Sequence, residues 1–342
     1  MNEFLMICER IVPEIVSVLK ERYKILNHLV YEEPIGRRTL ATATDLPERT
    51  VRSHIELMRA NGLVDIYKPG IFLTDEGQSI VPKLRNFLNE LDRINELESR
   101  LTEALSIDRV IITPTEGTLM VKKLGFAAAK LLQELLEPDS VVAISGGSTM
   151  AAVAEEMPIL PFNPTVVPAR GGVGGAVVEY QANVIASVLA ERLRGTYKML
   201  HLPDGLSQDS LHMLMTCEPQ IKEISDLISR TDVLLFGIGT AMRMADQRHI
   251  ADEVRKQLVD NHAVGEALGQ YCDMAGKLIY STNNIGLSLP DVAKVPNVIA
   301  VAGGQEKASA IIGVMRACQK GILIIDEQAA EGMRQLLQIS AL

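Results

Sequence analysis

Four glycine-rich segments hold the residues of this chain that are best suited to chemistry. They are 145–149 (SGGST), 169–172 (ARGG), 237–240 (GIGT) and 303–307 (GGQEK). Each follows an apolar run, and the first leads into a helix-forming stretch of small residues. Such a turn presents backbone N–H groups at a helix N-terminus, where phosphate binds well. The chemistry we expect here is recognition of a phosphorylated ligand.

Side chains in these segments add to the backbone donors. Ser148 and Thr149 offer hydroxyl groups, and Arg170 and Lys307 offer the positive charge that phosphate recognition requires. A single glycine-rich turn is ordinary punctuation between a strand and a helix. Four such turns, two of them with a cation, form a more specific pattern. Two separated loop-plus-cation clusters suit a ligand with two phosphate groups.

A short polar stretch offers a catalytic alternative. Asp260, Asn261 and His262 are followed by Glu266, and this combination could transfer protons on a sugar phosphate. The other interpretation is a polar loop in which Glu266 accepts hydrogen bonds from ligand hydroxyls. The sequence has no GxSxG or Walker-type motif, and its cysteines and histidines do not cluster as metal ligands do. We therefore expect a binding site without catalytic residues, cofactor or metal.

The glycine-rich segments are expected to lie at one edge of a parallel sheet. From residue 109 onward, short apolar runs alternate with helical segments, which is typical of a doubly wound α/β domain. The expected strands are 109–113, 140–145, 165–169, 197–202, 232–239, 277–280, 297–304 and 321–326. The expected helices include 118–136, 180–194, 218–230, 306–317 and 327–338. Ligands bind such sheets at the carboxyl ends of the strands, where the four segments fall.

The first hundred residues have a different pattern. Short helices are expected at 37–43 and 47–60, joined by a tight turn at 44–46. On the second helix, an apolar face and a charged face can be separated by helical spacing. The inward face has Val51, Ile55 and Met58, and the outward face has Arg49, Arg52, Glu56 and Arg59. This is the arrangement of a helix-turn-helix, whose second helix enters the DNA major groove.

A wing is expected to follow these helices. Strands at 63–67 and 71–74 are joined by Lys68-Pro69-Gly70, a typical turn sequence that places Lys68 on the wing. Residues 36–68 carry six basic and four acidic side chains, a local charge of +2 in a chain whose net charge is −9. An acidic chain is a poor candidate for nucleic-acid binding as a whole. The prediction of DNA binding therefore depends on this local pattern.

Residues 74–105 are expected to form one long helix between the two domains. Leucine or isoleucine recurs every three or four residues along it, at 84, 88, 91, 94, 97, 101 and 105. Such a stripe either packs on a neighbouring domain or dimerises, and we favour dimerisation. The expected domains are 1–74 for DNA binding, 75–106 for the linker and oligomerisation helix, and 107–342 for effector binding.

Composition limits the class of protein. The chain has 342 residues, enough for about two domains, and 47% of them are hydrophobic. Its four scattered cysteines suit a reducing compartment. The N-terminus lacks the basic start of a signal peptide, and no apolar run approaches the roughly 20 residues that span a bilayer. We expect a cytoplasmic protein without a membrane partner.

Longer motifs show a resemblance to a known family. The stretches EPIGRRTLATATDLPERTVR and LVDIYKPGIFLTDEG, followed by SGGSTMAAVAE, VPARGG, QANVIA, FGIG, DNHAVGEALG and IAVAGGQEKASAI, are similar to those of SorC/DeoR-type transcriptional regulators, over essentially the whole chain. EPIGRR and VPARGG point to the branch that regulates glycolytic genes. The later glycine loops are also shared with sugar-phosphate isomerases and deaminases of similar fold.

The resemblance implies roles for individual residues. The expected ligand-binding residues are Gly146, Gly147, Ser148, Thr149, Arg170, Gly171, Gln181, Asn183, Gly239, Arg248, Glu266 and Lys307. The expected DNA-binding residues are Arg37, Arg38, Arg49, Thr50, Arg52, Ser53 and Lys68. The implied function is a homo-oligomeric repressor that leaves operator DNA when it binds a sugar phosphate, fructose-1,6-bisphosphate above all. Two alternatives stay open: a sugar-phosphate isomerase or deaminase fused to a DNA-binding domain, and a phosphosugar-responsive activator.

Overall fold

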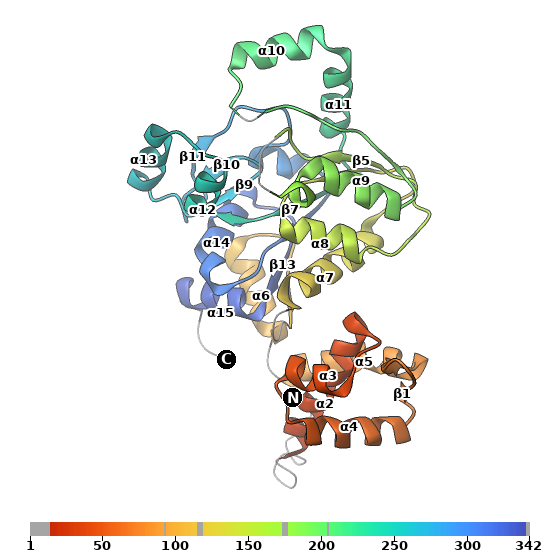
Figure 1. Ribbon diagram of the computed structural model, residues 1–342. Helices are drawn as coiled ribbons and strands as arrows, with labels where there is room; N and C mark the ends of the chain where they lie inside the picture. The colour runs from red at the N-terminus through yellow and green to blue at the C-terminus, as the bar shows by residue number, and fades with distance from the viewer. Residues whose placement is uncertain (1–13, 92–93, 115–118, 173–176, 204, 340–342) are drawn as a thin grey trace. The chain divides into compact units, whose positions relative to one another are not determined.

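A computed structural model describes residues 14–91, 94–114, 119–172, 177–203 and 205–339 of the chain. The chain folds into two compact units (Figure 1). Among the described residues, one unit contains residues 14–96 and Leu119, and the other contains residues 97–114 and 120–339.

The N-terminal unit is a winged helix. Its elements are α2 (Glu14–Glu32), α3 (Arg37–Thr44), α4 (Glu48–Ala60), β1 (Val64–Ile66), β2 (Ile71–Leu73) and α5 (Asp75–Leu91). Strands β1 and β2 pair antiparallel, with Val64 opposite Leu73, as the wing prediction requires. The predicted inward residues Val51, Ile55 and Met58 are at most 2% exposed and belong to the core of this unit. The helix-turn-helix and wing predictions are confirmed.

The recognition helix begins one residue later than predicted. Pro47 has φ −56° and ψ 138°, a non-helical conformation, so it occupies the N-cap position and α4 starts at Glu48. Helix α3 ends at Thr44, and Asp45 follows it with a left-handed φ of 54°. An aspartate tolerates this conformation better than most residues, which is how the tight turn closes.

Among the described residues, the second unit is built on a seven-stranded parallel sheet. Its strands are β3 (Arg109–Thr113), β4 (Val141–Ile144), β5 (Thr165–Pro168), β6 (Thr196–Tyr197), β7 (Val233–Gly237), β12 (Asn297–Val301) and β13 (Ile322–Asp326). They lie in the order β3-β13-β12-β7-β4-β5-β6, and every adjacent pair is parallel. The chain builds β4, β5 and β6 toward one side and β7, β12 and β13 toward the other. The direction reverses between β4 and β7, so the predicted doubly wound fold is confirmed.

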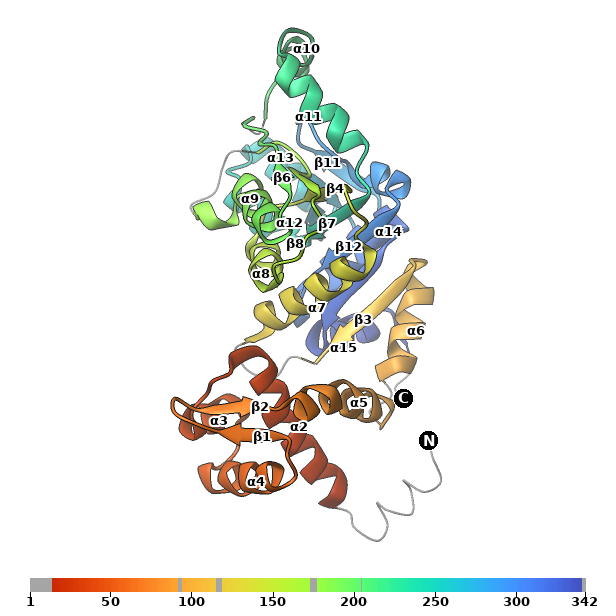
Figure 2. The same cartoon turned by 90° about the vertical axis from the view of Figure 1, so that its right-hand side faces the viewer.

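Helices cover both faces of this sheet (Figure 2). They are α6 (Ile94–Leu105), α7 (Met120–Leu135), α8 (Ser148–Glu156), α9 (Ala182–Arg192), α11 (Pro219–Ser229), α14 (Ala308–Cys318) and α15 (Glu327–Leu336). Helix α10 (Gln208–Cys217) lies apart from the sheet and packs against α11. Helices α7, α8 and α9 form one layer, whose leucines and alanines build the main core with β4, β5 and β7. Helices α11 and α14 lie on the opposite face, as right-handed crossovers require.

A small antiparallel sheet beside the parallel one was not predicted. It contains β8 (Gly239–Thr240), β9 (Gly265–Ala267), β10 (Gln270–Cys272) and β11 (Leu278–Ser281), with α12 (Ala241–Gln247) and α13 (Asp252–Asp260) inserted after β8. The predicted strand 277–280 belongs here rather than to the parallel sheet. The predicted strand 197–202 is also wrong beyond its start. The Asn183 side chain bonds both the backbone N–H and the backbone C=O of Leu200, which therefore do not pair with a neighbouring strand.

The leucine stripe of residues 84–105 divides between the two units. The structure describes α5 and α6 on either side of residues 92–93, which lie outside the described ranges. Leu88 packs in the core of the winged helix. Leu101 and Leu105 are 0% and 2% exposed in the sheet unit. Much of the stripe therefore serves the two cores, and its role in dimerisation stays a prediction.

Candidate functional site

The loops after β4 and β7 meet where the strand order reverses. Ser145, directly after β4, donates its backbone N–H to Leu235 O at 2.9 Å, and its Oγ accepts from Gly237 N at 3.2 Å. In open α/β sheets, ligands bind outside the carboxyl ends of the strands at such a reversal. We call this place the switch-point site; it is formed by residues 145–149 and 237–240.

The first loop is shaped for an anion. Gly147 has a φ of 120° and caps α8, whose first residues are Ser148 and Thr149. A Cβ on Gly146 would lie 2.9 Å from Tyr180 O, so the loop packs closely against the segment that leads into α9. The first-turn N–H groups of a helix have no partner within it. Those of α8 are thus available to a phosphate, together with the exposed Ser148 hydroxyl.

Arg170 lies on one flank of the switch-point site. It is 8% exposed, and its Nε donates to Gly171 O at 3.1 Å. A Cβ on Gly269 would lie 2.5 Å from Arg170 Nη1, so the arginine passes directly over that glycine. The Arg170–Gly286 bridge holds the backbone at the end of β5. The cation is therefore positioned before any ligand arrives.

The small sheet brings an ion pair to the same flank. Gly239 in β8 is paired with Glu266 in β9, so the chain after β7 runs directly to this carboxylate. Glu266 Oε1 lies 2.9 Å from Arg248 Nη2 and accepts from Gly269 N at 2.7 Å. Burial first, and the Glu266 charge second, raise the pKa of Tyr271 above its usual value. The charges of Arg170 and Arg248 lower the pKa of the same tyrosine. These four groups therefore form one cluster. We call it the Arg170 flank, and it contains Arg170, Arg248, Glu266 and Tyr271.

A second cationic flank lies after β12. Lys307 ends the short helix η4 (Gln305–Lys307) and precedes α14. Burial lowers the pKa of Lys307, and the guanidinium of Arg243 on α12 lowers it further, while the carboxylates of Glu306 and Asp326 raise it. The two cations are therefore close enough to repel each other, an arrangement that an anion between them would relieve. We call Lys307 and Arg243 the Lys307 flank.

Arg243 and Tyr271 were missed by reasoning from the sequence. Arg243 lies on the seven-residue helix α12, too short for a recognisable pattern. Tyr271 is fully buried, and its hydroxyl has no hydrogen-bond partner in the described part of the chain. Its position in a strand of three residues gave no signal either.

The remaining predicted ligand residues have varied surroundings. Gly171 packs against Leu202, and Gln181 occupies the N-cap position of α9 without a capping bond from its side chain. Asn183 is buried, and its amide both donates to Leu200 O and accepts from Leu200 N. In the structure Asn183 thus holds the 200–202 segment, and its contact with a ligand stays a prediction, as does the whole ligand set.

The stretch considered for catalysis is not brought together. Asp260 and His262 are exposed at the end of α13, whereas Glu266 is 3% exposed and already bonded to Arg248 and Gly269. No group of three or more histidine, cysteine or acidic side chains that could hold a metal ion occurs within the described ranges.

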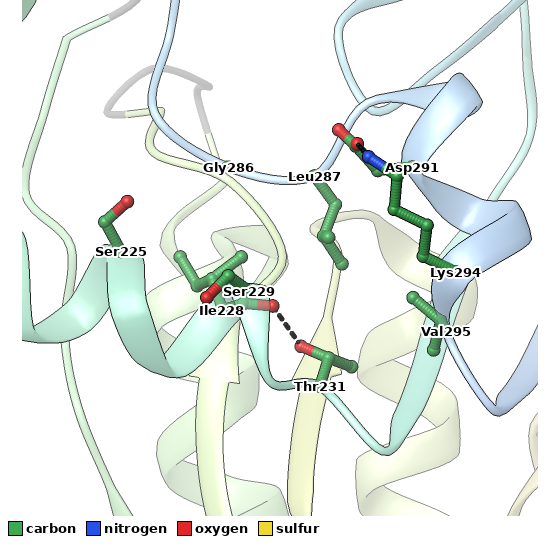
Figure 3. Close-up of a pocket in the computed structure, with 9 residues that line it drawn as sticks. All are labelled: Ser225, Ile228, Ser229, Thr231, Gly286, Leu287, Asp291, Lys294 and Val295. Atoms are coloured by element: carbon green, nitrogen blue, oxygen red, sulfur yellow. Dashed lines mark hydrogen bonds and ion pairs between the residues drawn. The ribbon is translucent and has the colours of Figure 1, made fainter.

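A separate hollow of about 210 Å³ lies between α11 and residues 286–295 (Figure 3). Its lining includes Ile228, Leu287 and Val295. Several polar groups there are already bonded: Thr231 Oγ1 donates to Ile228 O at 2.7 Å, and Lys294 Nζ donates to Asp291 Oδ1 at 2.8 Å. None of the predicted ligand residues lines this hollow, which offers an anion much less than the switch-point site does.

In the N-terminal unit, the predicted DNA-contacting side chains stay on the surface. Arg37, Arg38, Arg49, Arg52, Ser53 and Lys68 are exposed, and Thr50 is half-buried. Two arginines have acidic neighbours: Arg52 Nε lies 2.9 Å from Glu56 Oε1, and Arg38 Nε lies 3.6 Å from Glu48 Oε1. Their base and phosphate contacts stay predictions.

Two residues of this unit were missed, one buried and one exposed. His54 points inward from α4, where Nε2 lies 2.8 Å from Glu21 Oε2 and Nδ1 accepts from Arg22 Nε at 3.3 Å. It ties the recognition helix to α2. Tyr67, beside Lys68 on the wing, is 62% exposed. A tyrosine so placed can extend the wing's contact with a nucleic-acid backbone.

Comparison with known proteins matches both units. Residues 18–88 match the family model of the CggR N-terminal DNA-binding domain, and residues 89–334 match the model of a sugar-binding domain. The central glycolytic genes regulator of Priestia megaterium is 36% identical over 337 residues, covering 97% of this chain and 98% of that protein. The chain belongs to this family of SorC-type transcriptional regulators.

Other members of the family agree with the assignment. The central glycolytic genes regulator of Bacillus subtilis is 34% identical over 336 residues, with 97% of this chain and 98% of that protein covered. A crystal structure of a SorC family regulator from Enterococcus faecalis is 34% identical, with a TM-score of 0.64 over 70% of this chain and 99% of that one. Full-length SorC from Klebsiella pneumoniae, at 21% identity, shares the fold, with a TM-score of 0.64 over 93% of this chain and 98% of that one.

Family membership decides between two of the alternatives left by the sequence. The matched domains and relatives are those of DNA-binding, sugar-binding transcriptional regulators, so the chain is a regulator and the enzyme alternative is set aside. None of the described helices is long and apolar enough to cross a membrane.

Proposed function

We propose that this regulator represses glycolytic genes from the cytoplasm and leaves its operator when it binds fructose-1,6-bisphosphate or a closely related sugar phosphate. The observation that supports this best is the pair of cationic flanks on either side of the switch-point site. Two relatives that cover nearly the whole chain carry the name of central glycolytic genes regulator.

The two flanks suit two phosphates on one small molecule. Strands β12, β7, β4 and β5 are consecutive neighbours, so Lys307 and Arg170 follow strands on either side of the glycine loops after β7 and β4. One phosphate binds the α8 N-terminus and the Arg170 flank, and the other binds the Lys307 flank. A sugar between them places its hydroxyls near the Glu266 carboxylate. A monophosphate leaves one flank unneutralised and therefore binds more weakly.

Release from DNA requires coupling between the effector and the oligomer. A ligand shifts a conformational equilibrium only by its difference in affinity for the two states. We propose that the repressor binds its operator as a homo-oligomer, whose two or more recognition helices must be spaced to match the operator half-sites. Effector binding favours a packing of sheet units that does not allow this spacing.

Fluorescence anisotropy tests the proposal. The full chain is titrated onto labelled duplex from upstream of its own operon, and fructose-1,6-bisphosphate is then added. Wild type and the control Arg230→Ala, an exposed arginine on the α11 C-cap, are expected to release DNA at the same effector concentration. Lys307→Ala is expected to need at least tenfold more. Release of Lys307→Ala at the wild-type concentration contradicts the site, and DNA binding that ignores the sugar contradicts the effector.

The sign of regulation needs its own assay. In a reconstituted transcription reaction with the same promoter, a repressor lowers transcript yield and fructose-1,6-bisphosphate restores it. An increase in transcript on adding the protein identifies the activator alternative.

A further inference from the structure

The hydroxyl group of Tyr271 is buried beside charged groups and bonded to none of them. The residue is 0% exposed, and among the residues whose placement the structure gives, its hydroxyl finds no hydrogen-bond partner. A buried hydroxyl of this kind has lost its bonds to water and gained none in return, which destabilises the arrangement that contains it. A second arrangement, in which the hydroxyl reaches an acceptor, would be favoured by the same amount.

The hairpin of β9 and β10 places a carboxylate opposite this tyrosine. Leu268 and Gly269 form its two-residue turn, with φ angles of 52° and 80°, as a type I′ turn requires. The turn sets the register in which Tyr271 pairs with Glu266. Side chains directly opposite each other in an antiparallel pair lie on one face of the sheet, with Cβ atoms about 5 Å apart. The Glu266 carboxylate is therefore a neighbouring acceptor on the face that carries Tyr271.

This carboxylate is already bonded to other donors. Glu266 Oε1 lies 2.9 Å from Arg248 Nη2 and accepts from Gly269 N at 2.7 Å. A charged guanidinium is a stronger donor to a carboxylate than a neutral phenol is. Arg248 therefore holds Glu266 in the described arrangement, and Tyr271 is left without it.

The ring of Tyr271 is packed so that its hydroxyl cannot turn toward water. It contacts alanines of α12 and Leu258 of α13, and the ring of Tyr280 lies 5.9 Å away at an angle of 48°. Arg248 is the C-cap residue of the same α12. The guanidinium and the hydroxyl thus lie within one packed cluster of the small sheet, on either side of the competition for Glu266.

We propose that an effector phosphate draws Arg248 away from Glu266, and that the Tyr271 hydroxyl then donates a hydrogen bond to the released carboxylate. This inference rests on the proposed function, in which the Arg170 flank binds one phosphate. A phosphate monoester carries a charge of about −1.5 to −2 at neutral pH, so it attracts a guanidinium more strongly than a carboxylate does. Tyr271 is then a positioning residue that raises effector affinity without touching the effector, because its new bond exists only in the liganded state.

Tyr271→Phe in the full chain separates this role from a purely structural one, because it should change stability and affinity in opposite directions. Without effector, the variant keeps the packed ring and loses an unsatisfied hydroxyl, so its unfolding temperature should rise by about 2–4 °C. Its affinity for fructose-1,6-bisphosphate, measured by calorimetry, should fall about tenfold. Tyr280→Phe, the same substitution on the neighbouring strand β11, is the matched control and should bind the sugar phosphate as wild type does.

A second variant tests the competition for Glu266 with no ligand present. In Arg248→Met the carboxylate has lost its arginine and should accept from Tyr271. Adding Tyr271→Phe to this variant should therefore lower the unfolding temperature instead of raising it. A rise of similar size in both backgrounds would show that Arg248 does not keep the hydroxyl from Glu266, which contradicts the inference.

The calorimetric outcomes distinguish this inference from the proposed function. Wild-type affinity for fructose-1,6-bisphosphate in Tyr271→Phe overturns the inference and leaves the proposed function intact. A joint loss of stability and affinity also overturns it, because the tyrosine then serves only the packing of the small sheet. A wild-type protein that does not bind fructose-1,6-bisphosphate overturns the proposed function, and the inference with it.

Discussion

On helix α4, Arg49, Arg52 and Arg59 are exposed to solvent, whereas Arg170 in the sheet unit is 8% exposed and passes over Gly269. An exposed arginine stays hydrated and can move toward a phosphate wherever DNA presents one. A buried arginine has already lost most of its water, so it must be held by neighbours and has a fixed direction. The DNA-binding surface is therefore expected to attract a polymer of regular charge, and the proposed switch-point site to select one small molecule.

This difference also affects how substitutions combine. Exposed cations act on DNA nearly independently, through the release of counterions. Both cations of the Arg170 flank act on Tyr271, and Arg248 is also paired with Glu266, so the removal of one should change the others. Substitutions in the switch-point site should therefore have larger and less additive effects than those on α4.

The largest effect is expected for Arg170→Ala. Loss of a buried, hydrogen-bonded cation should raise the fructose-1,6-bisphosphate concentration that releases DNA by about 100-fold or more. Arg170→Lys keeps the charge but loses the planar guanidinium. Its releasing concentration should lie between those of wild type and Arg170→Ala. Anisotropy measures the release, and thermal unfolding checks that each variant is folded. A half-maximal effector concentration equal to that of wild type contradicts the expectation.

Substitutions on the DNA-binding surface should have intermediate effects. Arg49→Ala or Arg52→Ala is expected to weaken operator binding by about 1–3 kcal/mol and to relax sequence specificity if the side chain contacts a base. Arg37→Ala, at a predicted phosphate contact, should weaken operator and scrambled DNA alike and reduce the salt slope by about 1. Titrations at several salt concentrations separate the two kinds of contact. Equal behaviour of the three variants would mean that α4 does not read bases.

A pH effect should distinguish the Lys307 flank from the exposed surface. Phosphate binds the protonated Lys307, and the lowered pKa means that this proton is lost at a lower pH than in an ordinary lysine. Effector affinity should therefore fall as pH rises through the alkaline range, at lower pH than an ordinary lysine would give, while the effector phosphates stay charged. Arg243→Gln removes one cause of the lowered Lys307 pKa. In this variant the decline in effector affinity should therefore occur at higher pH. Calorimetry across this range in wild type and Arg243→Gln is the measurement, and identical pH profiles would show that the two cations are not coupled.

The smallest effect concerns the i,i+4 pair on α4. Glu56→Gln removes an exposed partner of Arg52 and should lower stability by about 0.5 kcal/mol at most. DNA binding should nevertheless become about two- to fivefold tighter at low salt, because a negative charge leaves the DNA-facing side. Glu253→Gln on α13 removes the same charge from the sheet unit and serves as the control. Weaker DNA binding by Glu56→Gln would mean that the glutamate orients Arg52 for its contact.

Local periodicity predicts the surface of α4 well. The alternation of Val51, Ile55 and Met58 with the outward arginines fixes both faces of the helix without knowledge of the rest of the fold. The positions of the glycine loops could be predicted equally well from the sequence. Each loop follows a run of four or five apolar residues, so the end of the run shows where the strand ends. The rule for parallel sheets then brings those ends to one edge.

The small sheet could not be predicted in the same way. Its strands contain two to four residues, too few to show an alternation, and β8 pairs with a strand that begins about 25 residues later. Arg243 and Tyr271 depend on this sheet for their positions. The leucine stripe is a different case: core packing and dimerisation need the same spacing, so only the tertiary fold shows that Leu88 and Leu101 are buried within their own units.

Helix α6 has a consequence for dividing the protein into fragments. Strand β3 is at the outer edge of the parallel sheet, and two of its outward amides are bonded by side chains of α6: Thr102 Oγ1 accepts from Val110 N at 2.9 Å, and Glu98 Oε1 accepts from Ile112 N at 2.6 Å. These bonds cover an edge that could otherwise recruit a strand from another molecule. A sheet unit truncated at residue 107 would lose this cover and tend to aggregate, whereas one that begins at Ile94 would retain it.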